Sequence, residues 1–193
     1  ILEGRTAYYS ICKCKDKYSG LLTLSLSYTR EGKKLNRIIK KITHPLSPQK
    51  HKSGLSTYYS VNENTTKDVY YYTFREGVFI GSYDRECLLA AMSHLSKGKS
   101  ISKNSHFISV KSTAGKKVDA NIFVNPPYLK DLLSGFLNID FDLLEHFSSW
   151  SEMDLISKEN EFFLNGYTSP GEDTSGYYLN KFEGQKAQKR ELT

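Results

Sequence analysis

Short runs rich in tyrosine, phenylalanine and leucine recur along this 193-residue chain, and tight polar turns separate them. The clearest pair is DVYYYTF (68–74) and GVFIGSY (77–83), which Arg75, Glu76 and Gly77 connect. Aromatic residues favour half-buried strands, and a glycine in such a short turn tolerates the positive φ that many hairpins need. The pattern therefore restricts the chain to folds that contain antiparallel sheet.

The same reasoning predicts strands at 6–13, 21–28, 55–62, 118–124, 151–158 and 161–168. Amphipathic periodicity predicts helices at 31–42, 84–97, 126–136 and 140–147. Ser82 is the expected N-cap residue of the second helix, and Gly98 its C-terminal stop. We expect a loop at SPQKHKSG (47–54) and a polar connector at 97–117, with one helical turn around 106–110.

This order of elements favours an α+β fold, mainly of antiparallel sheet, with the helices packed on one face. It is compatible with a pseudo-repeat of two halves, each a hairpin followed by a helix. Residues 1–170 are expected to form one domain, with 1–100 and 101–170 as alternative subdomains. Residues 171–193 read as a linker and the start of a further unit, and the absence of an initial Met suggests a processed or excised fragment.

Positive charge is concentrated at the front of the chain. The net charge is +9 over residues 1–60, +3 over 61–120 and −6 over 121–193. In the helix at 31–42, five cations lie opposite the apolar stripe of Leu35, Ile38, Ile39 and Ile42. They are Lys33, Lys34, Arg37, Lys40 and Lys41. This face could bind phosphates or an anionic membrane surface, or it is simply the solvated side of a surface helix.

Sequence-specific nucleic-acid binding is not expected, because no base-reading module accompanies these cations. No run approaches the roughly 20 apolar residues of a membrane-spanning helix. Tyr70, Tyr71 and Tyr72 could form a stacking platform for sugars or bases, but strand packing explains them without a ligand.

Cysteine and histidine spacing predicts no metal, no cofactor and no disulfide framework. Cys12 and Cys14 lie two apart on one strand, which is a poor geometry for pairing with each other, and Cys87 reads as a small core residue. The five histidines form no closely spaced ligand pair.

The segment HFSSWSEMDL (146–155) contains the residue types of a hydrolase triad. His146 falls on a short helix, whereas Glu152 and Asp154 fall on the following strand. No oxyanion feature or activated-serine turn is visible nearby, so we predict no catalytic residues. The segment reads better as a helix end that leads into a hairpin strand.

NIFVNPPYLKDLL (121–133), HFSSWSEMDLISKENEFFLNGYT (146–168) and YYLNKFEGQ (177–185) together resemble an uncharacterised family of Bacteroidota envelope proteins. The similarity covers roughly residues 56–185 and includes a Trp-x-x-x-Asp-Leu hairpin that closes on Leu-Asn-Gly. The resemblance implies an exported, envelope-anchored protein and carries no catalytic residues.

These observations favour a non-enzymatic interaction or scaffold module of the bacterial envelope or periplasm, whose partner is an unidentified protein or envelope component. The alternative is an anionic-ligand or membrane-surface module that uses the helix at 31–42, and a hydrolase is the least favoured reading.

Overall fold

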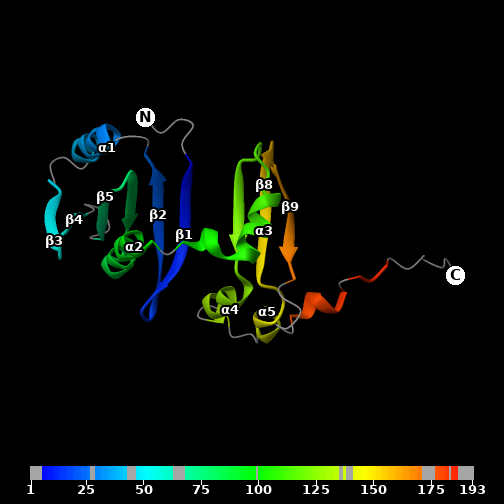
Figure 1. Cartoon of the computed structure of the whole chain (residues 1–193). Coiled ribbons are helices and arrows are strands. Elements are labelled where there is room, and N and C mark those ends of the chain that lie inside the picture. The colour runs from blue at the N-terminus through cyan, green and yellow to red at the C-terminus, as the bar shows by residue number, and fades with distance from the viewer. Residues whose placement is uncertain are drawn as a thin grey trace. The chain divides into compact units, whose positions relative to one another are not determined.

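The computed structural model describes residues 6–26, 29–42, 47–62, 68–98, 100–134, 137, 141–170, 177–182 and 184–186. The chain divides into two compact units, Ile1–Lys99 and Ser100–Thr193 (Figure 1). Much of the segment at 171–193 that we expected to be a linker and a further unit lies outside the described residues. The α+β class and the antiparallel sheets are confirmed.

The first unit contains a six-stranded antiparallel sheet of order β1-β2-β6-β5-β4-β3. The strands are β1 (Ala7–Cys14), β2 (Lys17–Ser25), β3 (Gln49–Ser53), β4 (Ser56–Asn62), β5 (Val69–Arg75) and β6 (Val78–Ser82). Strand β3 forms where the sequence predicts a loop. Its charged residues gave no apolar alternation, and pairing with β4 determines its conformation.

Helices α1 (Thr29–Ile42) and α2 (Arg85–Lys97) pack on opposite faces of this sheet. Leu35 and Ile39 of α1 join a cluster with Tyr72 and Phe79, whereas Leu88 of α2 joins another. The expectation that helices lie on one face is therefore wrong for this unit. The physical reason is that the central strands are apolar on both sides, so each side needs a cover.

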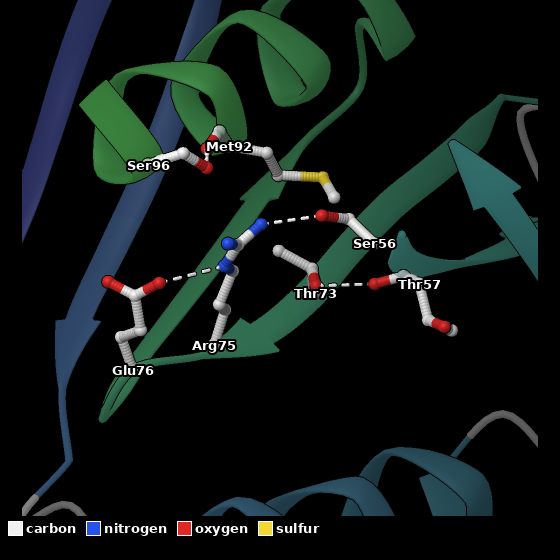
Figure 2. A network of polar contacts seen from close by, with 7 residues as sticks. All are labelled: Ser56, Thr57, Thr73, Arg75, Glu76, Met92 and Ser96. Atoms are coloured by element: carbon white, nitrogen blue, oxygen red, sulfur yellow. Dashed lines mark hydrogen bonds and ion pairs between the residues drawn. The ribbon is translucent and has the colours of Figure 1, made fainter. Parts of the chain in front are cut away.

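The α2 side of the sheet carries polar contacts near the β5–β6 turn. Figure 2 shows Arg75, which donates to the Ser56 hydroxyl and to Glu76, while the Thr73 hydroxyl donates to the Thr57 carbonyl at 2.7 Å. Thr73 is 1% exposed, so this hydrogen bond satisfies a buried hydroxyl. The contacts fix β4 to β5 where the strand pair ends.

Helix α2 begins and ends with capping residues. Asp84 is the N-cap, and its side chain accepts a hydrogen bond from the Cys87 amide at 2.9 Å. Ser82, the N-cap expected from the sequence, instead accepts from the Asp84 amide and donates to the Gly20 carbonyl. Gly98 ends the helix in the left-handed conformation at φ 61°, as predicted.

A disulfide joins Cys14 of β1 to Cys87 of α2, across 73 residues of sequence and a Cα–Cα distance of 5.4 Å. Spacing along the sequence gave no sign of it, because the pairing depends on α2 crossing the face of β1. The expectation that Cys87 is only a small core residue is thus wrong, although Cys87 is buried. Cys12 remains a free thiol, and burial raises its pKa.

The second unit contains a three-stranded antiparallel sheet of order β7-β8-β9. Its strands are β7 (Ala120–Val124), β8 (Trp150–Lys158) and β9 (Glu161–Ser169), and its helices are α3 (Ser105–Thr113), α4 (Pro126–Ser134) and α5 (Asp142–Glu145). The 3₁₀ turns are η1 (Ile101–Lys103) and η3 (Tyr178–Phe182). The predicted single turn at 106–110 proves to be the longer helix α3, which Asn104 caps.

Helix α3 lies on one face of the three-stranded sheet (Figure 1). The Phe107 ring contacts Phe123 of β7 at 5.3 Å and Trp150 of β8 at 5.1 Å between centroids. Val110 is fully buried. Among the described residues, no helix is long and apolar enough to cross a bilayer.

Removing the disulfide should destabilise the first unit. Closing a loop of 73 residues is worth about 4 kcal/mol in the chain-entropy account. Cys14→Ser should therefore lower the thermal midpoint of the first unit by more than about 10 °C. Tyrosine near-UV circular dichroism follows this transition. Cys12→Ser, two residues away on the same strand, is the matched control and should change the midpoint little; equal effects of both substitutions would contradict the pairing.

Candidate functional site

The segment 146–155 does not assemble a triad. His146 is exposed after α5, and its backbone carbonyl accepts from the Tyr178 amide at 2.6 Å. Ser148 and Ser149 are buried before β8. Within the described residues, the His146 side chain forms no hydrogen bond with Glu152 or Asp154. In this structure His146 is therefore not hydrogen-bonded to either acid.

Two carboxylates and a loop form a polar network on β8 instead. Asp154 accepts from the Gly115 amide at 2.9 Å and from the Asn121 side-chain amide at 2.6 Å. The Asn121 amide also donates to the Gly115 carbonyl at 3.1 Å. Glu152 is only 1% exposed, and its Oε1 atom has no hydrogen-bond partner among the described residues. The network fastens the α3–β7 loop to β8.

The pKa values of the Glu152 and Asp154 carboxyl groups are shifted in opposite directions. Burial raises the pKa of Glu152, and a hydrogen bond to Asp154 and the charge of Asp154 add to the effect. The Gly115 amide lowers the pKa of Asp154, and hydrogen bonds from Glu152 and Asn121 lower it further. The pair therefore favours a protonated Glu152 that donates to an ionised Asp154. Sequence reasoning separated these acids from His146 but missed the burial of Glu152.

The five predicted cations of α1 are all exposed: Lys33, Lys34, Arg37, Lys40 and Lys41. Ion pairs between residues in the described part of the chain involve none of them. Lys33 also lines a cavity of about 340 Å³, together with Asn36 of α1 and Arg75 beside the β5–β6 turn. The structure thus brings one predicted residue to a hollow and leaves the others on an open helix face.

The tyrosine run of β5 belongs largely to the core. Tyr72 is fully buried and contacts Phe79 at 6.0 Å between ring centroids. Burial raises the pKa of Tyr72 to about 12, and Tyr59 adds to it. The Tyr70 ring lies against Gly81 on the neighbouring strand, where a Cβ would collide with it. Packing thus accounts for Tyr70 and Tyr72, as the sequence favoured.

Strand β9 lies at one edge of the three-stranded sheet and exposes four large apolar side chains (Figure 1). The exposed fractions are 74% for Phe162, 49% for Phe163, 59% for Leu164 and 43% for Tyr167. Because side chains alternate along a strand, Phe163 and Tyr167 lie on one face, and Phe162 and Leu164 on the other. Each face of β9 therefore has large apolar side chains that are open to solvent.

The backbones of β8 and β9 approach closely at Gly166. A Cβ at this position would collide with the Glu152 carbonyl and the Met153 Cα. Only glycine fits such an approach, which gives the glycine of the Leu164-Asn165-Gly166 motif a packing role. Leu164, Gly166 and Thr168 also line a largely apolar cavity of about 430 Å³ with residues of α4 and α5. The motif positions β9 against β8 and leaves its outer edge free.

No protein-family model matches the chain, no curated protein matches it, and no solved structure matches it. The residues above therefore carry the functional argument.

The carboxylate pair predicts an unusual dependence of stability on pH. A raised pKa in the folded state means that the stability from Glu152 is fully present below its ordinary pKa of 4.5 and is lost as pH rises through the higher folded value. For Asp154 the sign is reversed, so its contribution is lost only as pH falls below its ordinary 3.8. The contribution of the pair to the stability of the second unit should therefore be greatest between pH 3.8 and pH 4.5 and should decrease as the pH rises toward neutral.

Glu152→Gln should abolish the loss of stability as the pH rises above 4.5, because glutamine remains neutral. Thermal unfolding followed by the fluorescence of Trp150, the single tryptophan, reports on this unit alone. Exposed Glu161→Gln is the matched control and should keep the wild-type profile. A Glu152→Gln profile that still falls with rising pH would refute the assignment.

Proposed function

We propose that the chain is a non-enzymatic interaction module of a bacterial envelope protein, and that strand β9 is its docking element. The observation that carries the proposal is the exposure of Phe162, Phe163, Leu164 and Tyr167 on a sheet edge. An edge strand has unpaired N–H and C=O groups, and apolar side chains on it add area that a partner can bury. Both terms favour the addition of a strand from a partner.

Two further features support an exported location. The Cys14–Cys87 disulfide is of a kind that persists in oxidising compartments and is rare in the reducing cytosol. The hairpin motif through which the chain resembles envelope proteins spans β8 and β9. Its last residue, Gly166, allows the two strands to approach closely. The docking strand therefore overlaps the family-like motif.

The proposal is tested by replacing Phe162 with a photo-crosslinking phenylalanine analogue in cells that carry the protein. Irradiation should yield a discrete adduct, which mass spectrometry of its peptides identifies. Leu55, an exposed apolar residue in the β3–β4 turn, is the matched control site and should yield none. Equal yields at both sites would contradict a docking role for β9. A hydrolytic activity that His146→Ala or Asp154→Ala abolishes would contradict the non-enzymatic assignment.

The second candidate function is binding to an anionic surface through α1. It is favoured by one observation, namely that all five cations are exposed and unpaired among the described residues while Leu35 holds the opposite side of the helix in the core. Cations near an anionic bilayer contribute about 1 kcal/mol each and are screened by salt.

The combined substitution of Arg37, Lys40 and Lys41 by glutamine should weaken binding to phosphatidylglycerol vesicles on the order of a hundredfold at low salt. Cosedimentation at increasing salt measures this. The same triple change at Lys111, Lys116 and Lys117 of the second unit removes equal charge and is the control. Absent binding by the wild type at low salt, or equal loss in both triple variants, would remove this candidate.

A further inference from the structure

The edges of the two sheets differ in how they are protected against pairing. Strand β3 has only five residues and carries Lys50 and Lys52, and β7 also has only five residues. Strand β1 also exposes the apolar residues Tyr8, Tyr9 and Ile11, but it carries Lys13 near its end. Short length and lysine are the usual devices that keep an edge from pairing. The nine-residue β9 contains neither lysine nor proline.

Charge along β9 is confined to its first residue, Glu161. The strand is also regular, because its pairing with β8 keeps one register from Glu161 to Ser169 without a bulge. Its outer edge, free of any partner strand in the described part of the chain, is thus nine residues long, has no bulge and is uncharged after Glu161. Such an edge is expected to be covered by another strand.

We propose that β9 pairs antiparallel with β9 of a second copy of this chain, about a two-fold axis at Asn165. This inference rests on the proposed docking role of β9 and identifies its occupant. In this register Phe163 of one copy faces Tyr167 of the other, and the pair occurs twice. Glu161 faces the neutral Ser169, so the two acidic groups lie at opposite ends of the strand pair.

The register of the two β9 strands follows from which side chains of β9 face one another when two copies pair. It is the antiparallel register in which all nine residues of β9 pair with all nine of the second copy. Shorter overlaps toward the start of the strand bring the two Glu161 side chains together, and overlaps toward its end leave Phe162 and Phe163 exposed. Cross-strand aromatic pairs contribute roughly 0.2–1 kcal/mol each beyond a pair of alanines. The register centred on Asn165 therefore has the most favourable side-chain pairs and the least repulsion between the two Glu161 carboxylates.

The pairing would join the two three-stranded sheets into one antiparallel sheet of order β7-β8-β9-β9-β8-β7. Because the same edge serves both copies, the assembly is isologous and closes as a dimer. A heterologous contact between β9 and another edge would instead propagate. The geometry thus points to a dimer and not to a filament.

A charge exchange tests the register. Phe163→Glu should weaken the dimer at least about tenfold in sedimentation equilibrium of the full chain, because it places a carboxylate against Tyr167 of the second copy. Adding Tyr167→Lys should restore association to within about threefold, since the introduced carboxylate of one copy then faces the introduced ammonium group of the other. This direction of exchange avoids a new carboxylate opposite Glu152, the partner of Tyr167 on β8.

A crosslink tests the axis independently. Residues opposite each other in antiparallel strands have Cα atoms about 4.5–5.5 Å apart, which a disulfide spans. In a Cys12→Ser background, Asn165→Cys should form a disulfide-linked dimer on mild oxidation. Asn160→Cys, in the exposed β8–β9 turn, is the matched control and should form no disulfide-linked dimer. Far-UV circular dichroism shows whether Phe163→Glu folds. If it does not fold, the Asn165→Cys crosslink alone tests the proposed dimer.

A chain that is monomeric at about 100 µM, a dimer that Phe163→Glu leaves intact, or an Asn165→Cys variant that does not crosslink would each overturn the second-copy assignment. A β9-specific photo-adduct with a different protein, together with a monomeric chain, would overturn the dimer and retain the docking function. Loss of both the adduct and the dimer would overturn both proposals.

Discussion

The pleat of the β-strand imposes the main constraint on this protein. Successive side chains point to opposite sides, so a strand that is apolar at consecutive positions must have cover on both faces. Strands β5 and β6 meet this condition because α1 covers Tyr72 and Phe79 while α2 covers Ile80 and Tyr71. Strand β9 has the same apolar character at the edge of its sheet and lacks equivalent cover on its exposed part. The central strands of the first unit are thus covered within the chain, whereas the cover of β9 would come from the partner that we propose.

Much of the fold is predictable from local pattern. The hairpin at 69–82, the amphipathic helix at 31–42 and the hairpin at 151–168 follow from alternation, helical period and turn residues, and the structure has an element at each. Strand β3 is not predictable in this way, because its lysines and serines show no apolar alternation and β4 supplies the pairing. The Cys14–Cys87 bridge and the two-sided packing of helices depend on long-range contacts that spacing does not encode.

The features of the candidate site also differ in whether local sequence pattern predicts them. The exposure of Lys33, Arg37 and Lys40 is predictable, since the helical period places them opposite the apolar stripe of α1. The exposure of β9 is not predictable, because EFFLNGYT and DVYYYTF have similar composition and only the sheet order shows which is central and which is at the edge. The burial of Glu152 is equally hidden, because alternation groups it with Trp150 and Asp154 but does not show that α3 covers that part of the face.

The disulfide also determines how the chain would transmit a mechanical load. Tension applied at the two ends of the protein passes from Cys14 through the covalent bridge to Cys87 and bypasses the 73 residues between them. Strands β2 to β6 and helix α1 lie inside this loop, so they carry no load along the backbone. The loop withholds about 250 Å of extensible chain from any pull. The segment between Cys14 and Cys87 would therefore act as a short, inextensible link, and elements outside it, such as β1, would be the first to yield.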